Sequence, residues 1–262
     1  MPSDGDECWS LTPGTINYER CVGRYRFFAA EARGRVALDC ACGPGVGTRI
    51  LARAGARRVI GMDLDKRALA EAAARCRCEV NVEILPGDIT RLPFPDATFD
   101  LVVSSETIEH VRDWRACFSE LLRVLKPEGV LCLSTPNRPV FSAFRRRSAV
   151  ASHVREASSS GLKRTLDRHF RQVEILGQDY HRSGDVFYWT RRLFNAWAPM
   201  ALRSLIVRGK TRAGRPAATP PREEFPADDA DAPRRSRVHP LDAFPGCVHT
   251  YTIARCRGPR AR

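Results

Sequence analysis

The chain has 262 residues, of which 43% are hydrophobic and 28% are charged. These values are ordinary for a globular protein with a buried core, and no run approaches the roughly 20 apolar residues of a membrane-spanning helix. The first residues are acidic where a secretory signal would be basic and then apolar, so we expect a cytoplasmic protein. The ten cysteines include no Cys-x-x-Cys pair, which favours reduced thiols over a disulfide framework or a zinc site.

Short apolar segments alternate with helical patterns from about residue 35 onward. This alternation predicts parallel strands joined by crossover helices, with helices on both faces of the sheet. The predicted fold class is therefore α/β, with a doubly wound, mostly parallel sheet. The predicted strands are residues 36–38, 59–62, 80–85, 99–103, 130–133, 173–176 and 248–254. The predicted helices include residues 49–54, 66–75, 114–125 and 162–170.

Composition divides the chain into four parts. Residues 1–34 are predicted as an N-terminal helical segment, and residues 35–179 as the α/β core. Residues 180–245 interrupt the alternation with aromatic, basic and then proline-rich stretches, which predicts a partly flexible insertion before the last strand. Residues 246–262 supply that final strand and a tail.

The positive charge is concentrated in the C-terminal part. Residues 1–140 hold 19 basic and 19 acidic residues, so the net charge of +13 lies entirely in residues 141–262. A solvated face explains such a surplus, and so does contact with an anionic surface such as a membrane. Residues 187–208 mix large aromatics with arginines, as an interfacial membrane segment does, but a helix that packs on the core as a lid has the same composition.

The first predicted strand runs into a glycine-rich turn, residues 39–47. In an open parallel sheet, ligands bind beyond the carboxyl ends of the strands, and glycines there let the backbone approach the ligand closely. Thr48 stands where a dinucleotide fingerprint has its third glycine. Asp39 beside the loop is poorly suited to a pyrophosphate and well suited to a cationic ligand. This turn therefore predicts a binding site for a ligand other than a dinucleotide.

Two further carboxylates follow the next two strands. Asp63 ends the second strand, where it can accept both hydrogen bonds of a ribose diol, and Asp88 ends the third, where it can accept from an adenine amino group. Either residue could instead cap a helix or form a turn. Because Asp39, Asp63 and Asp88 fall at successive strand ends, together they predict a nucleoside site.

Residues 36–47 resemble motif I of the class I S-adenosylmethionine-dependent methyltransferases, and residues 59–65, 85–95, 99–111 and 121–137 resemble the motifs that follow it. Residues 24–27, 134–137, 153–156 and 176–178 resemble a bacterial type 11/23-like subgroup that is often associated with surface-carbohydrate and natural-product pathways. The resemblance implies a seven-stranded sheet with an antiparallel last strand and S-adenosylmethionine as the cofactor. The cofactor-binding residues that it implies are Asp39, Ala41, Gly43, Gly45, Asp63, Leu64, Asp88, Ile89 and Ser104.

One position departs from the family pattern. Ala41 stands where the family more often has glycine. A methyl group is small, so we expect this alanine to be tolerated.

The segment after the fourth predicted strand faces the methyl acceptor. A hydroxyl acceptor has to lose its proton, which requires a general base or a metal ion that lowers its pKa. If the segment is helical, Glu106, Glu109 and His110 share one face and suit Mg²⁺. This Glu-x-x-Glu-His element resembles the metal-binding motif of ubiquinone-pathway and small-RNA 2′-O-methyltransferases, although in other relatives it only shapes the cofactor pocket. His153 is a further candidate ligand or base, so the predicted catalytic residues are Glu106, His110 and His153.

These features predict an enzyme that transfers a methyl group from S-adenosylmethionine to a hydroxyl of a sugar, glycan or other small molecule. One alternative is an RNA 2′-O-methyltransferase, but no recognised RNA-binding module is present and we do not expect nucleic acid as a partner. Another alternative is a cofactor-binding partner subunit that catalyses nothing itself. Retention of the Glu-x-x-Glu-His element argues for the enzyme.

Overall fold

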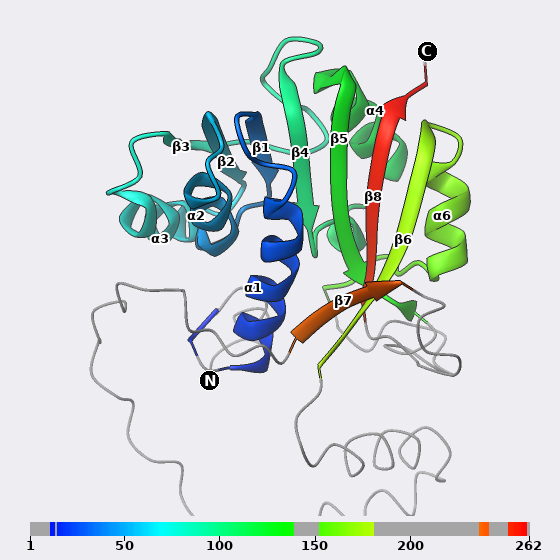
Figure 1. Cartoon of the computed structure of the whole chain (residues 1–262), viewed down its shortest axis with the longest axis horizontal. Helices are drawn as coiled ribbons and strands as arrows, with labels where there is room; N and C mark the ends of the chain where they lie inside the picture. The colour runs from blue at the N-terminus through cyan, green and yellow to red at the C-terminus, as the bar shows by residue number, and fades with distance from the viewer. Residues whose placement is uncertain (1–10, 14, 139–151, 181–235, 241–250, 261–262) are drawn as a thin grey trace, which may run out of the picture. The chain divides into compact units, whose positions relative to one another are not determined.

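The computed structural model describes residues 11–13, 15–138, 152–180, 236–240 and 251–260. The described residues belong to one compact unit, formed by Met1–Tyr180 and Arg234–Arg262 (Figure 1). Most of the predicted insertion and its candidate lid lie outside the described residues, so the lid, membrane and flexible-loop interpretations stay predictions. No helix in the described part is long and apolar enough to cross a bilayer.

One sheet of eight strands runs through this unit in the order β3-β2-β1-β4-β5-β8-β6-β7. The first five strands are parallel, and β8 is antiparallel to both of its neighbours, so the predicted mostly parallel sheet is confirmed. The strands are β1 (Val36–Cys40), β2 (Arg58–Asp63), β3 (Val82–Pro86), β4 (Phe99–Ser105), β5 (Leu125–Pro136), β6 (Phe170–Tyr180), β7 (Ser236–Pro240) and β8 (Tyr251–Pro259).

The strand β7 is an addition to the seven predicted strands. It pairs antiparallel with Leu176–Tyr180 at the far end of β6, within the range predicted as an insertion. Its five residues are too short to show an alternating pattern and end in Pro240. A proline is tolerated at a sheet edge because its missing N–H is not needed there. The pairing with β6 therefore defines this strand.

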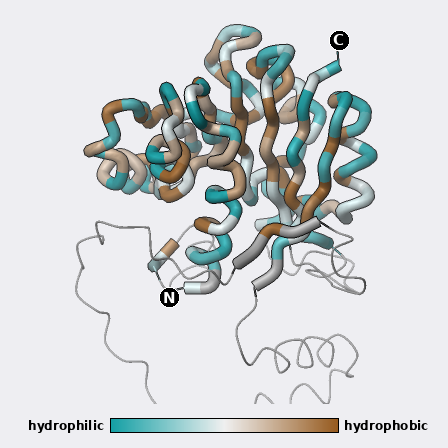
Figure 2. The backbone as a smooth tube through the Cα atoms, viewed as in Figure 1, coloured by the Kyte–Doolittle hydropathy of each residue, from teal (hydrophilic) through white to brown (hydrophobic). Residues whose placement is uncertain are grey.

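Helices cover the two faces of the sheet. Figure 1 shows α1, α2 and α3 in front of it and α4 behind. The predicted apolar face of α4 is confirmed, because its core-facing residues are buried, and α6 shares the same core. Figure 2 shows hydrophobic residues along the central strands. The helices are α1 (Ile16–Ala29), α2 (Val46–Arg53), α3 (Lys66–Cys76), α4 (Trp114–Val124) and α6 (Ser159–Leu166), with a 3₁₀ turn η1 (Ile108–His110).

The parallel register brings the carboxyl ends of β1, β2 and β3 to one edge of the sheet. Cys40 pairs with Met62, and Asp63 pairs with Pro86. Beyond the strands, the N–H of Cys42 donates to the carbonyl of Met62 at 2.9 Å, and the N–H of Gly87 donates to the carbonyl of Asp63 at 3.0 Å. These bonds hold the loops that follow the three strands next to one another.

Candidate active site

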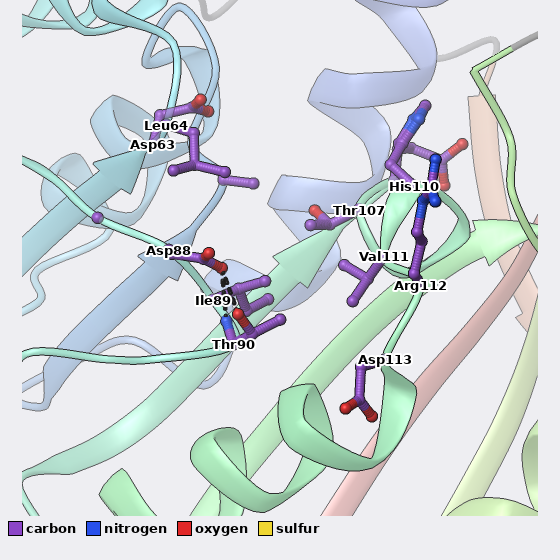
Figure 3. A pocket seen from close by; sticks show the side chains of 13 residues that line it. Asp63, Leu64, Asp88, Ile89, Thr90, Thr107, His110, Val111, Arg112 and Asp113 are labelled. Carbon is purple, nitrogen blue, oxygen red and sulfur yellow. Dashed lines mark hydrogen bonds between the residues drawn. The ribbon is translucent and has the colours of Figure 1, made fainter.

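Two adjoining hollows open at this edge of the sheet. The outer hollow, of about 460 Å³, is lined by Asp63, Leu64, Asp88, Ile89, Thr107 and Val111 among others (Figure 3). The inner hollow, of about 290 Å³, lies between α1 and the glycine loop and is lined by Arg24, Tyr25, Gly43, Gly47, Ser105 and Ser152 among others. Ala41, Asp63, Glu106 and His110 line both. Hollows of this size suit a small molecule.

Asp63 connects the glycine loop to the end of β2. Its Oδ2 accepts a hydrogen bond from the N–H of Gly43 at 2.8 Å, and its Oδ1 accepts one from the N–H of Asp65 at 2.9 Å. Each carboxylate oxygen has a second lone pair, so Asp63 can also accept from a diol. The cap of α3 is Asp65, whose side chain accepts from the N–H of Arg67. The helix-cap interpretation therefore applies to Asp65 and leaves Asp63 to the site.

Asp88 projects into the outer hollow opposite Thr107 and Val111 (Figure 3). Its Oδ1 accepts from both the N–H and the hydroxyl of Thr90 at 2.8 Å, so it is also a turn residue. Those bonds hold the carboxyl group in place, and Oδ2 is the oxygen left to face a ligand. Beside it, buried Ile89 and exposed Leu64 give the hollow apolar walls that suit a flat ring.

Asp39 does not reach either hollow, contrary to its predicted contact with the cofactor. It is fully buried, and it accepts hydrogen bonds from the hydroxyls of Tyr25 and Thr48, both at 2.7 Å. Thr48 therefore replaces the third glycine for a reason, since its hydroxyl binds this carboxylate. Burial raises the pKa of Asp39 to about 6, against the lowering effect of the two hydrogen bonds. Asp39 supports the glycine loop from beneath.

Replacing Asp39 with asparagine should change how stability depends on pH. Because burial raises the pKa of Asp39 from 3.8 to about 6, its contribution to the unfolding free energy of the wild type should fall by about 2 kcal/mol between pH 4 and pH 6 and level off above about pH 7. Asp39→Asn lacks this fall. Urea unfolding at pH 4, 5, 6 and 7 measures it, and parallel profiles for the two proteins would contradict the assignment.

The glycines of the loop have different roles. Gly43 has φ of +54°, and a Cβ there would meet nothing within 4 Å, so it leaves space beside the inner hollow. Gly45, predicted to bind the cofactor, lines neither hollow; a Cβ on it would lie 2.8 Å from the backbone of Ala72 in α3. Gly45 therefore allows the loop to pack closely on α3, and Gly43 is the residue open to a ligand.

Ala41 has a left-handed backbone, with φ of +55°. An L-residue pays roughly 1–2 kcal/mol for this conformation, which is the physical reason for glycine at this position. The expectation of tolerance rested on the size of the methyl group, but the strain lies in the backbone. Alanine can occupy this position because hydrogen bonds from the N–H groups of Cys42 and Gly43 to β2 hold the loop in place.

Ala41→Gly should raise the free energy of unfolding by about 1 kcal/mol, because glycine removes the left-handed strain but adds freedom to the unfolded chain. Ala97, with φ of +51°, lies away from both hollows and is the matched comparison, so Ala97→Gly should gain a similar amount. Urea denaturation measures both. A loss of stability in Ala41→Gly alone would show that packing of its methyl group matters more than φ.

Ser105 takes the place predicted for Ser104. Ser104 is fully buried and lines neither hollow, and its hydroxyl has no hydrogen-bond partner among the described residues. Neighbouring side chains of a strand point to opposite faces, so the next residue is the one that lines the inner hollow. The Ser105 hydroxyl lies 2.9 Å from that of Ser134 and accepts a bond from Nε of Arg24 at 3.3 Å.

Arg24 is a site residue that sequence reasoning missed. It lies on α1 at the wall of the inner hollow and is only 5% exposed. Its Nη1 donates to Oε1 of Gln178 at 2.9 Å, and its guanidinium lies 4.8 Å from the ring centre of Tyr251. These partners come from β6 and β8, more than 150 residues along the chain, so no local pattern could reveal them. The result is a fixed cation facing the glycine loop.

Glu106 lies where the two hollows meet. Its backbone is left-handed, with φ of +54°, and its Oε1 accepts a bond from the hydroxyl of Ser134 at 2.9 Å. Burial raises the pKa of Glu106, against the lowering effects of Arg24 and of the Ser134 hydroxyl. A strained, half-buried carboxylate of this kind is typical of functional sites. The expectation that Glu106 shares a helical face with Glu109 and His110 is wrong, because only Ile108–His110 form a turn of helix.

Glu109, His110 and His153 form a separate cluster. Their ligating atoms lie within 4.8 Å of one another, and the group excludes Glu106. The two imidazole rings meet edge to face at 4.9 Å. Glu109 is buried, and its Oε2 accepts from the hydroxyl of Thr135 at 3.0 Å. The predicted metal ligands were Glu106, Glu109 and His110, whereas the observed cluster contains His153 and not Glu106.

Comparisons with known proteins show which proteins this chain is similar to. Residues 38–133 match the family described as a methyltransferase domain. A probable S-adenosylmethionine-dependent methyltransferase of Mycolicibacterium smegmatis is 38% identical over 160 residues, which cover 61% of each chain. A demethylmenaquinone methyltransferase of Bacillus licheniformis is 36% identical over 112 residues, which cover 42% of this chain and 48% of that one. The chain therefore spans less than two thirds of the length of these relatives.

Solved structures of other proteins share the fold of this chain. A crystal structure of an S-adenosylmethionine-dependent methyltransferase of Thermotoga maritima, described as a possible histamine N-methyltransferase, superposes with a TM-score of 0.58. The alignment covers 93% of this chain and 91% of that one at 14% identity, which establishes a shared fold only. The conclusion is that residues 38–133 match a methyltransferase domain, in a chain that is similar to S-adenosylmethionine-dependent methyltransferases and shares their fold.

Proposed function

We propose that the protein transfers a methyl group from S-adenosylmethionine to a hydroxyl of a small acceptor, such as a sugar. The observation that carries the proposal is the placement of Glu106. Its half-buried carboxylate adjoins both the hollow formed by Asp63 and Asp88 and the hollow beside the glycine loop. One residue can therefore act where the methyl donor and the acceptor would meet.

The residues of the two hollows fit the cofactor. Asp63 would hold the ribose diol, and Asp88 would accept from the adenine amino group between the apolar side chains of Leu64 and Ile89. The space beside Gly43 would admit the methionine part. Arg24 is the buried cation of the inner hollow, and its guanidinium would bind the carboxylate of that part.

Arg24→Met should lower the affinity for S-adenosylmethionine by roughly 30-fold, because one charged hydrogen-bonded contact contributes about 2 kcal/mol. Its affinity for decarboxylated S-adenosylmethionine should stay within threefold of the wild type. Calorimetric titration of both compounds measures the difference, with Arg26→Met, on the exposed side of α1, as the charge control. Equal losses for the two compounds would assign Arg24 a purely structural role.

The chemistry follows from these positions. When bound, S-adenosylmethionine supplies an electrophilic methyl group on a positively charged sulfur. The acceptor oxygen would form a bond to this methyl carbon as the carbon–sulfur bond breaks, and Glu106 would accept the hydroxyl proton. Because the transfer is an in-line displacement, fixed positions supply much of the acceleration. The hydroxyl of Ser134 orients Glu106, and both this hydrogen bond and the charge of Arg24 favour its ionised form.

The test is to incubate the protein with cofactor labelled in its methyl group and with an extract of small molecules, and to identify labelled products by mass spectrometry. A methyl ether is the expected product. Label on nitrogen or carbon would contradict O-methylation, and label on ribose of added RNA would support the nucleic-acid alternative. Bound cofactor without transfer to any acceptor would favour the non-catalytic partner subunit.

A further inference from the structure

Gln178 is a fully buried glutamine on β6 that the transfer chemistry above does not use. It pairs with Tyr251 of β8 on one side and with Val238 of β7 on the other, so two neighbouring strands fix its backbone. Directly opposite residues of an antiparallel pair place their side chains on the same face of the sheet. The side chains of Gln178 and Tyr251 therefore share one face, and both contact α1.

The amide of Gln178 connects two positions of α1. Its Nε2 donates to the backbone carbonyl of Arg20 at 2.9 Å, and its Oε1 accepts from Nη1 of Arg24 at 2.9 Å. A flipped amide would place its NH₂ group against the guanidinium and its oxygen against the carbonyl, so these two partners allow only one orientation. Because Arg20 and Arg24 are four residues apart, their side chains lie on one face of the helix. Both guanidiniums lie over the ring of Tyr251, at 5.3 and 4.8 Å from its centre.

The contacts of Arg24 occupy two of its three guanidinium nitrogens. Nη1 donates to Gln178, and Nε donates to the hydroxyl of Ser105 at 3.3 Å. Both of these partners are neutral, and Nη2 makes no hydrogen bond within the described part of the chain. A buried charge needs a partner of opposite charge, and guanidinium groups bind carboxylates well. Because Arg24 lines the inner hollow, this arrangement favours an anionic ligand there.

We propose that Gln178 is the positioning residue of Arg24, and that its amide directs Nη2 toward the carboxylate of the methionine part of the cofactor. This inference rests on the proposed function, in which Arg24 binds that carboxylate. An arginine side chain has many rotamers, and a fixed acceptor at Nη1 reduces the entropy that binding would otherwise cost. Gln178 lines neither hollow, so it acts on the ligand only through Arg24.

The experiment measures the affinities of the full chain for S-adenosylmethionine and for decarboxylated S-adenosylmethionine by calorimetric titration. Gln178→Met keeps the length of the side chain and removes both hydrogen bonds. It should lower the affinity for S-adenosylmethionine by roughly 10-fold and that for the decarboxylated compound by less than about threefold. In the Arg24→Met background the same substitution should cost less than about threefold for either compound, because the residue through which it acts is absent.

The matched control is Gln172→Met. Gln172 is exposed on the same strand and lines neither hollow at the glycine loop, so this variant should bind both compounds as the wild type does.

Gln178→Glu is the second variant, in case Gln178→Met does not fold. A carboxylate at this position keeps the bond to Arg24, and its negative charge competes with the carboxylate of the ligand. The affinity for S-adenosylmethionine should therefore fall by at least about 10-fold, whereas the decarboxylated compound should bind within about threefold of the wild type. Circular dichroism verifies that each variant is folded.

The proposal is overturned if a folded Gln178 variant keeps the wild-type preference for the compound with the carboxylate, or if the affinities for both compounds fall equally. It is also overturned if Gln178→Met costs as much in the Arg24→Met background, or if the wild type shows no preference. These outcomes concern binding alone. A wild type that shows the preference but transfers no methyl group would contradict the proposed function and leave the role of Gln178 unchanged.

Discussion

Asp63→Ala is expected to weaken binding of S-adenosylmethionine by about 100-fold. The substitution removes a carboxylate that would accept both ribose hydroxyls, and hydrogen bonds to a charged group contribute about 1.5–3 kcal/mol each. It also releases the N–H of Gly43, so the glycine loop loses its connection to the end of β2. Calorimetric titration of the cofactor into wild type and variant measures the loss.

The control for this variant is Asp96→Ala. Asp96 pairs with Arg123 at 2.9 Å, is largely exposed and lines neither hollow, so its loss should leave affinity unchanged. Circular dichroism verifies that both variants are folded. Affinity within threefold of the wild type in folded Asp63→Ala would remove the ribose assignment and the placement of the nucleoside that depends on it.

Glu106→Gln is expected to lower kcat by roughly 10²- to 10⁴-fold, the usual contribution of a general base. The amide keeps the size of the side chain and can still accept from Ser134, so cofactor affinity should change by less than about threefold. Glu128→Gln, on the exposed turn within β5, is the matched control and should retain full activity. Steady-state rates with the acceptor identified above measure the effect.

The pH profile distinguishes a base from a structural carboxylate. A general base acts in its ionised form, and burial raises the pKa of Glu106 above its ordinary value of 4.5. The rate of the wild type should therefore rise with pH through that raised pKa, and Glu106→Gln should lose this rise. A variant that keeps the same rising limb at a lower rate would contradict the role of Glu106 as the base.

Patterns that repeat along the chain were sufficient to predict the sheet and the helices around it. Periods of two and of about 3.6 residues arise locally, and they identify β1 to β6 and α4 before any contact is known. Exact ends were less predictable. Leu125 begins β5 where its apolar spacing continues the pattern of α4, and Phe170 begins β6 where it continues that of α6. A buried apolar residue fits either element, and its neighbours in space determine which one forms.

Some residues of the candidate site could also be predicted from the sequence, and others could not. Asp63, Asp88 and Gly43 follow strand ends in the sequence, and the parallel register necessarily brings those ends together. The hydrogen bonds of Asp39 depend on Tyr25 of α1, and the surroundings of Arg24 depend on Gln178 and Tyr251. Partners so distant in sequence leave no local signal, because only the folded chain determines which of them meet.

The amino-acid sequence alone was therefore sufficient to predict the fold class, the edge of the sheet where a ligand is expected, and candidate residues for the cofactor. The tertiary structure decided that Asp39 and Gly45 support the loop, that Ser105 faces the cleft in place of Ser104, and that His153 joins Glu109 and His110. The reason is physical: the positions of strands and helices along the chain follow from local hydrophobic periodicity, whereas the direction of a side chain and the partner it meets depend on packing across the whole sheet.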